Sequence, residues 1–142
     1  MFLPFLGGER SLGWNAARRG CVDGLSYATT PSDIAQAALE AVAYRFADVL
    51  DALGGVDEVV VTGAALLANV DWTQVLADVL GRPLHVSGVP EASARGAALA
   101  AVGRFDVGAP IERVVEPRAD RHEIHLRARE VHRAAIENEE GT

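Results

Sequence analysis

The feature that most constrains the fold is a short β-branched run, Glu58–Thr62, which is followed by a helical stretch at 72–80 and a second strand-like run at 84–86. Runs of this length and type are typical of buried strands. The stretch between them carries apolar residues at steps of three and four, and Gly81 and Pro83 end it. A strand, a helix and a second strand in this order predict two neighbouring parallel strands joined by a right-handed crossover, and therefore an α/β fold.

A long helix is expected to precede this unit, from about Pro31 to Leu53. Thr30 to Asp33 carry capping residues around a proline, as at a helix start, and Gly54-Gly55 follow the end. Five residues form its expected apolar stripe: Leu39, Val42, Phe46, Val49 and Leu53. For the helix at 72–80, the spacing of Asp71 and Gln74 predicts a capping box.

The C-terminal part reads as helix, loop and helix. A small-residue helix is expected over 90–102, able to pack closely through Gly96, then a proline-containing loop over 104–118 and a charged helix over 120–138. The acidic end of the chain is expected to fray. Near the N-terminus only a short strand and turn at 20–27 interrupt the loops. Two strands are convincing, and because a two-stranded sheet is marginally stable alone, the pattern predicts an incomplete sheet.

Composition limits what the chain can bind. Hydrophobic residues make up 49% and charged residues 23%, and 142 residues predict a single domain, 1–142. The formal net charge of −7 disfavours nucleic acid and anionic membranes. All 13 basic residues are arginine, which excludes a P-loop lysine, a Schiff-base lysine and a Ser–Lys pair. No apolar run reaches membrane-spanning length and no signal peptide is recognisable, so the cytoplasm is the expected location.

Several noticeable side chains have a structural interpretation. Cys21 is the single cysteine, so it is expected as a small core residue rather than as part of a disulfide or a zinc site. Gly7-Gly8-Glu9-Arg10 either cradles a phosphate or forms a surface loop with an Arg–Glu pair, and we expect the surface loop. Trp14 and Trp72 are expected to be packing residues.

Three histidines near the C-terminus, His122, His125 and His132, lie close in sequence to Glu123 and Glu130. His122 and His125 are three residues apart and can share a helical face. No third ligand completes a metal site, so we expect a solvated helix and no metal.

Four segments, in order, carry a resemblance to a known family. They are PFLGGERS at 4–11, GCVDGLSYATTPSDIAQAALE at 20–40, VTGAALLA at 61–68 with WTQVLADVLG at 72–81, and EASARGAA at 91–98. Over about residues 3–105 the chain resembles the C-terminal domain of the FGGY-family carbohydrate kinases. Among the subfamilies, its motifs are most similar to those of gluconate and related sugar-acid kinases. The resemblance implies the C-terminal part of an actin-like (ribonuclease H-like) ATPase domain.

The resemblance also implies an ATP site at the turn after the first strand, formed by Thr62, Gly63, Ala64, Ala65 and Asn69. Asn69 matches a family position that can bond adenine. Glycines at such a turn permit positive φ and a close approach of the backbone to the nucleotide, and the next helix directs its amides toward the ligand. The family's second glycine is Ala64 here. An alanine at a positive-φ or close-approach position would weaken ATP binding, and Ala64→Gly would improve it.

The implied reaction is transfer of phosphate from ATP, with Mg²⁺ in the full-length enzyme, to a sugar or sugar acid. In the family, the base, the phosphate loop and the sugar contacts belong to an N-terminal half that this sequence does not match. Asp23 and Asp33 match signature positions and not the base. We therefore expect no catalytic residue, no metal site and no activity in this chain alone, with the sugar bound only by the full enzyme. The alternatives are a non-catalytic partner-binding module and a decayed kinase fragment.

A partner is expected for the same reason. In the family, the helix at 31–53 and the strand at 58–62 would belong to a sheet of more than two strands. With only two strands here, part of the apolar stripe of the helix is expected to be exposed. Exposed apolar surface and a free strand edge favour pairing with an N-terminal kinase half or self-association. The alternative is that the loop from Phe2 to Trp14 folds back over the stripe and gives a monomer.

Overall fold

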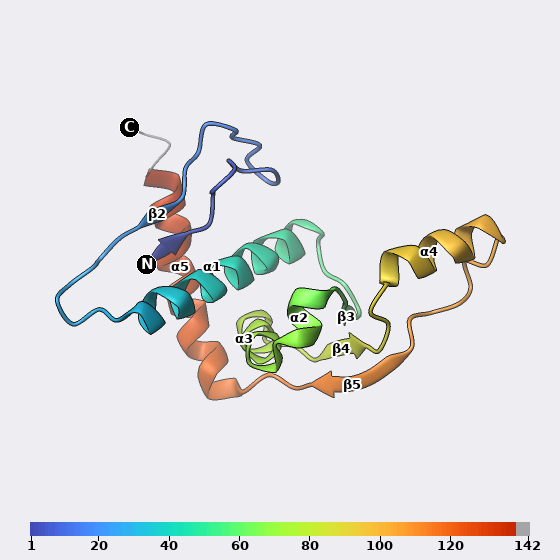
Figure 1. The fold of residues 1–142 in the computed structure, drawn as a ribbon. Helices are drawn as coiled ribbons and strands as arrows, with labels where there is room; N and C mark the ends of the chain where they lie inside the picture. The colour runs from blue at the N-terminus through green and yellow to red at the C-terminus, as the bar shows by residue number, and fades with distance from the viewer. Residues whose placement is uncertain (139–142) are drawn as a thin grey trace.

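A computed structural model describes residues 1–138 as a helical body on a small sheet, with one helical arm (Figure 1). In chain order the elements are β1 (Phe2–Leu3), β2 (Cys21–Val22), α1 (Pro31–Ala52), β3 (Val59–Val61), α2 (Ala64–Ala68), α3 (Val70–Leu80), β4 (Leu84–Ser87), α4 (Ala92–Ala101), β5 (Ile111–Val115) and α5 (Ala119–Asn138). The expected fraying of the acidic end concerns residues beyond Asn138 and lies outside the described residues. No helix within residues 1–138 is both long and apolar enough to span a bilayer.

The central unit is the predicted strand–helix–strand. β3 pairs in parallel with β4, with Val60 opposite His85, and α2 and α3 connect the two strands. The prediction of two neighbouring parallel strands is therefore confirmed, and the structural neighbours described below confirm the α/β fold. Val61, Leu84 and Val86 are buried beneath the helices, as expected of β-branched and apolar residues in a covered sheet.

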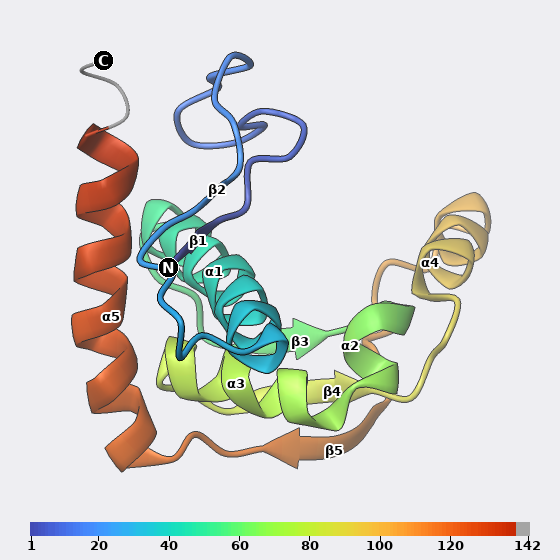
Figure 2. The same ribbon diagram turned by 60° about the vertical axis from the view of Figure 1, so that its left-hand side comes forward.

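A third strand was not expected. β5 lies inside the segment predicted as a loop over 104–118 and pairs antiparallel with β4, with Leu84 opposite Val115. The sheet order is β3-β4-β5, so β3 is an edge strand within the described residues (Figure 2). The loop prediction was wrong because β5 forms against the free edge of β4, a contact between distant parts of the chain that local sequence does not report.

The buried face of α1 differs from the predicted stripe. Its buried residues are Ala41, Ala43, Tyr44, Ala47 and Asp48, whereas the stripe residues Phe46 and Leu53 are 47% and 65% exposed. Ala43 and Ala47 join the main core together with Ala77 of α3. Small side chains let the two helices approach closely, so the larger residues of α1 lie at the edge of the contact.

The two helix starts gave different outcomes. The start of α1 is confirmed: Thr30 and Asp33 form a capping box, and Pro31 is the first helical residue. The predicted start of α3 was wrong, because the helix begins at Val70 and its N-cap is Asn69, not Asp71.

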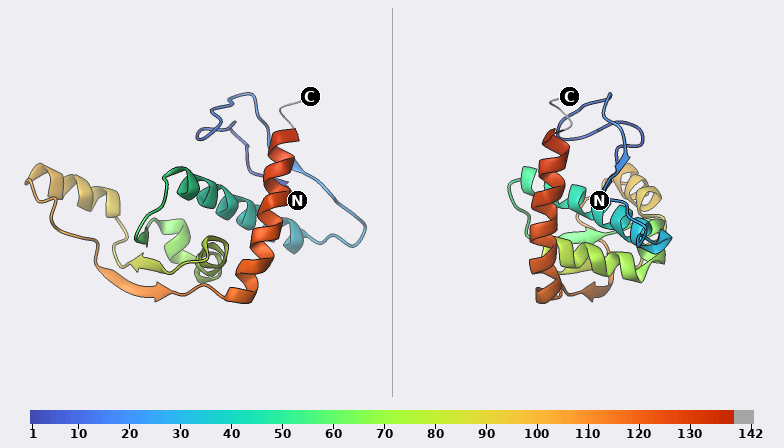
Figure 3. Two further views of the ribbon diagram at one scale, coloured as in Figure 1. Left: turned by 180° about the vertical axis from the view of Figure 1, so that it is seen from behind. Right: turned by 90° about the vertical axis from the view of Figure 1, so that its left-hand side faces the viewer.

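α5 packs along the body instead of standing in solvent (Figure 3, left). Each of its three histidines contacts another element. Nδ1 of His122 lies 2.8 Å from the Asp78 carbonyl, Nδ1 of His125 lies 3.1 Å from the Tyr44 hydroxyl, and Nε2 of His132 lies 3.2 Å from the Phe2 carbonyl. The prediction of a solvated helix holds for most of α5, whose buried residues are His132 and Ile136, but the three histidines also join the helix to α3, α1 and β1.

The N-terminal loop is attached by a buried ion cluster. Glu9 is 4% exposed and pairs with Arg18 and Arg45, so the expected surface pair with Arg10 was wrong. Arg18 also donates to the Ile136 carbonyl of α5 at 3.3 Å. Buried charges of this kind are tolerated only when paired, and here the pairing joins the loop to α1 and α5.

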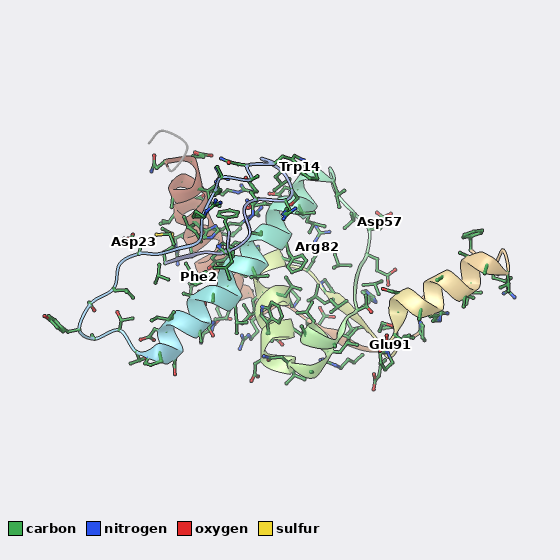
Figure 4. The ribbon with its side chains drawn as sticks, turned by 45° about the horizontal axis from the view of Figure 1, so that its top comes forward. Phe2, Trp14, Asp23, Asp57, Arg82 and Glu91 are labelled. Atoms are coloured by element: carbon green, nitrogen blue, oxygen red, sulfur yellow. The ribbon has the colours of Figure 1, made fainter. Side chains whose placement is uncertain are left out.

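Other parts of the chain lie apart from this body. α4 has no buried residue and projects as an arm, with Glu91 at its base (Figure 4). Nothing lies within 4 Å of the position that a Gly96 Cβ would take, so the expected close packing is not made within the described residues. Cys21 and Trp14 are exposed, contrary to expectation, whereas Trp72 is half-buried and its Nε1 donates to the Leu39 carbonyl at 3.2 Å.

Candidate functional site

The turn after β3 brings the predicted site residues together. Thr62 follows the strand, and Gly63 has φ 95° and ψ 141° before α2 begins at Ala64. A positive φ of this kind favours glycine, and no atom lies within 4 Å of the position that a Gly63 Cβ would take. The outer side of Gly63 is therefore open to a ligand.

Gly63 is also the N-cap of α2 and has no side chain that could accept a hydrogen bond from the first amides of the helix. The amides of Ala64 and Ala65 precede the first intrahelical bond, which the Leu67 amide donates to the Gly63 carbonyl at 3.1 Å. Uncapped amides at the carboxyl end of a strand are donors that suit an anionic or polar ligand.

Ala64 itself does not have a positive φ. It is the first residue of α2, where alanine is well suited. The conformational reason for expecting this alanine to hinder nucleotide binding was therefore wrong, because the positive φ belongs to Gly63. Close approach of a ligand to the Ala64 methyl group stays a prediction.

Asn69 lies between α2 and α3, where its Oδ1 accepts a hydrogen bond from the Trp72 amide at 3.0 Å. The residue predicted to bond adenine is thus also the N-cap of α3. Its Nδ2 group is the part of the side chain that this cap does not use. Asn69 and the other four predicted residues, Thr62 to Ala65, are all exposed.

Thr73 holds this corner in place and was not predicted. Its side chain is fully buried, and its hydroxyl donates to the Leu66 carbonyl at 2.7 Å and lies 3.0 Å from the Asn69 carbonyl. One hydroxyl thereby fixes the end of α2 against the first turn of α3. A threonine inside a helical pattern carries no signal for such a contact, because its partners are backbone atoms.

The signature residue Asp33 has a structural role. Its carboxylate accepts a hydrogen bond from the Thr30 amide at 2.8 Å and another from the Thr30 hydroxyl at 2.8 Å. These bonds, from the backbone and then the side chain of Thr30, lower the pKa of the Asp33 carboxyl. Asp33 thus caps α1, and within residues 1–138 no three potential metal ligands gather in one place.

Comparison with known proteins adds the family context. The sequence model of the FGGY family of carbohydrate kinases, C-terminal domain, matches residues 1–103. A glycerol kinase from Rhodopirellula baltica is 36% identical over 141 residues, which cover 89% of this chain and 26% of the relative. The chain spans about a fifth to a quarter of the length of the curated relatives it matches.

Solved structures agree on the fold. A xylulose kinase from Rhodospirillum rubrum matches 96% of this chain and 30% of its own chain, with a TM-score of 0.77 and 28% identity. A glycerol kinase from Plasmodium falciparum, solved with ADP, matches 97% of this chain with a TM-score of 0.74 and 18% identity. At that identity the second likeness concerns the fold alone.

Proposed function

Because this chain belongs to the FGGY family of carbohydrate kinases, we propose that it supplies the nucleotide-binding side of a kinase that transfers phosphate from ATP to a sugar or sugar acid. The observation that carries this proposal is the turn from Thr62 to Ala65. It combines a positive-φ glycine, open space beside that glycine and uncapped amides at the carboxyl end of a parallel strand.

ATP bound at this turn would supply the phosphoryl group. The amides of Ala64 and Ala65 would donate hydrogen bonds to the bound ATP, and Gly63, which has no side chain, would let the ATP approach the backbone. The Nδ2 group of Asn69 would donate to the adenosine part while its Oδ1 continues to cap α3. Mg²⁺ would act in the complete enzyme, where it offsets phosphate charge.

The 142-residue chain is proposed to be inactive alone, because the base and the sugar contacts expected in this family have no counterpart among its matched motifs. It would act with an N-terminal kinase half, in the cytoplasm, where ATP is available. The second candidate is a partner-binding module without catalysis. It is favoured by α4, which projects from the body with no buried residue and offers a surface for another polypeptide.

A chimera tests the proposed function directly. Residues 1–103 would replace the matching segment of the Rhodospirillum rubrum xylulose kinase, and ATP-dependent phosphorylation of xylulose would be measured. We expect a folded chimera to retain activity and Gly63→Ala to lower it about tenfold or more, since an alanine at this φ is strained.

Gly55→Ala is the matched control, because Gly55 also has a positive φ, 104°, and open space around it, but lies outside the turn. It should cost similar stability and leave activity nearly unchanged. A folded chimera without activity would contradict the proposal, as would equal losses from the two substitutions. The isolated chain should phosphorylate none of gluconate, xylulose and glycerol.

A further inference from the structure

A cavity of about 490 Å³ lies between the C-terminal ends of α1 and α3 and the side of α5. Its loop residues are Gly55, which precedes β3, and Arg82, which precedes β4. Because β3 and β4 are parallel, the cavity lies at the amino ends of these strands, and the candidate turn lies at the carboxyl end of β3. A volume of this size is typical of a small-molecule site.

The N-terminal loop takes no part in this cavity. Leu3 and Phe5 of the loop pack against Ile136 of α5 in a separate small core. The alternative in which the loop folds back over the helix stripe was wrong as to place, since Phe46 and Leu53 of the stripe stay 47% and 65% exposed. The cavity is lined only by residues of α1, α3, α5 and the loops that adjoin α1 and α3.

The walls of the cavity are mostly aliphatic. Each of the three helices contributes to them: Ala47, Leu50, Val79, Leu80 and Leu126. Such side chains cannot bond to hydroxyl groups, so a sugar placed against them would leave buried polar groups without partners. The walls therefore favour a ligand whose body is apolar.

Arg82, which is labelled in Figure 4, brings a positive charge to these walls. Its Nη1 donates to the Val56 carbonyl at 2.9 Å, which holds one side of the guanidinium. Within residues 1–138, its buried Nε has no hydrogen-bond partner and its Nη2 has none either. Buried donors in folded proteins are nearly always paired, so this pair of donors suits an acceptor from outside the chain.

The same pair of atoms binds carboxylates elsewhere in this chain. Nε and Nη2 of Arg118 donate to Asp78 at 3.0 and 2.5 Å. Nε and Nη2 of Arg129 donate to Asp48 at 3.0 and 2.7 Å. The planar fork of an arginine matches the two oxygens of a carboxylate. A carboxylate in the cavity would complete the fork of Arg82 once the guanidinium turns toward it, since Nε is covered in the described structure.

The other polar groups at the cavity do not compensate Arg82. Oδ2 of Asp51 accepts hydrogen bonds from Arg129 and Arg133, each at 2.7 Å, and Asp51 forms no ion pair with Arg82 within the described part of the chain. Nδ1 of His122 lies 2.8 Å from a backbone carbonyl of α3, so Nδ1 carries the proton of the neutral ring and Nε2 is an acceptor. The cationic anchor of this cavity is therefore Arg82.

We propose that this cavity binds a small organic carboxylate with an apolar body, either aryl or alkyl. The carboxylate is held by Nε and Nη2 of Arg82, and the body packs against the aliphatic walls. A carboxylate is favoured over a phosphate because one fork matches two oxygens and one negative charge, whereas a phosphate would leave further charge beside Asp51. This binding is independent of nucleotide binding and of the proposed kinase function.

Calorimetric titration of the complete chain tests the inference with three probes that share one body: 4-phenylbutyrate, 4-phenylbutan-1-ol and 4-phenylbutylamine. We expect 4-phenylbutyrate to bind with a dissociation constant of about 1 mM or tighter. The alcohol and the amine should bind about tenfold more weakly or not at all, because neither offers the fork a carboxylate. Backbone NMR shift changes should centre on residues 79–82 and 122–129.

Three substitutions test the anchor and the wall. Arg82→Gln should weaken 4-phenylbutyrate binding about tenfold or more, since it removes the fork and the charge. Leu126 is 47% exposed at the cavity, so Leu126→Glu and Leu126→Lys should both leave the chain folded, which circular dichroism checks. The Glu variant should bind the probe about tenfold more weakly than the Lys variant, because the two side chains place opposite charges beside the carboxylate.

Ile124→Glu is the matched control, since Ile124 is also 47% exposed on α5 but does not line the cavity. It should change the dissociation constant by less than about twofold. The inference is overturned if about 10 mM 4-phenylbutyrate gives neither heat nor shift changes, or if the alcohol binds as tightly as the acid. Equal losses from Ile124→Glu and Leu126→Glu also overturn it, as does unchanged binding by a folded Arg82→Gln variant. If Arg82→Gln does not fold, the two Leu126 variants decide.

Discussion

Asn69 combines two roles that substitution can separate. Its Oδ1 caps α3 through the Trp72 amide, and its Nδ2 is the proposed donor to the nucleotide. Asn69→Asp keeps the acceptor and loses the donor, so it should preserve stability while weakening ATP binding. Asn69→Ala loses both and should also lower the free energy of unfolding by about 1 kcal/mol. Chemical denaturation and an ATP titration of each variant measure the two effects.

If Asn69→Asp binds ATP as the wild type does, the side chain has a capping role only. If Asn69→Ala is as stable as the wild type, the cap contributes less than the geometry indicates.

Asp78 is the second residue whose environment makes a definite prediction. It is fully buried, and burial raises its pKa, but hydrogen bonds from the Arg118 side chain and backbone and from Gln74 more than offset this and lower the pKa overall. Asp78→Ala leaves those donors without an acceptor and should cost about 2–3 kcal/mol of unfolding free energy. Asp120→Ala, whose side chain is 80% exposed, is the control and should change stability by less than about 0.5 kcal/mol.

Urea denaturation at neutral pH measures both variants. Equal stability of the two variants would contradict this prediction. It would show that the hydrogen bonds of Asp78 to Arg118 and Gln74 add no stability beyond what hydrogen bonds to water provide.

At the scale of elements, sequence periodicity predicted what depends on local pattern. The β-branched run at β3, the helix between the parallel strands and the start of α1 at Pro31 are all as expected. β5 could not be predicted, since it forms only against the edge of β4. The buried face of α1 was misjudged because periodicity weights large apolar residues, whereas close contact with α3 selects Ala43 and Ala47.

The candidate site shows the same division. Its residues were predicted from a family motif, and the fold places Thr62 to Ala65 in one turn with Asn69 at the next helix boundary. The φ of Gly63 and the buried hydroxyl of Thr73 depend on how β3, α2 and α3 meet. Neither the positive φ of Gly63 nor the hydrogen bonds of the Thr73 hydroxyl could be predicted from the sequence alone.

The contact between α1 and α5 predicts a pH-dependent stability. Burial lowers the pKa of His125 and of His132, and the smaller charge effects on His132 come from groups that include Asp48 and Arg45. A histidine with a lowered pKa in the folded state binds fewer protons than it does in the unfolded state. Stability should therefore be fully present above the unfolded pKa of about 6.5 and should decrease as the pH falls below it.

The free energy of unfolding measured from about pH 7 to about pH 5 checks this dependence. His132→Gln should reduce the slope, because this buried imidazole has a lowered pKa in the folded state. A slope that does not respond to His132→Gln would assign the effect to other groups.

At the scale of the whole molecule, one body carries two surfaces that the described chain leaves without cover. The core joins α1, α3, α5 and the sheet, and an ion cluster that includes Asp48, Arg129 and Arg133 holds α5 against α1. The free edge of β3 and the arm α4 lie outside this core. The candidate turn follows β3 directly and therefore lies beside this free strand edge.

A two-dimensional NMR titration of the complete chain with Mg²⁺ and ATP tests the central claim most directly. The account predicts weak, saturable binding, with a dissociation constant above about 0.1 mM and shift changes centred on Thr62 to Ala65 and Asn69. Shift changes centred elsewhere, such as on α5, would contradict the account. So would a turn that stays unchanged at about 10 mM ATP, or a micromolar dissociation constant for the isolated chain.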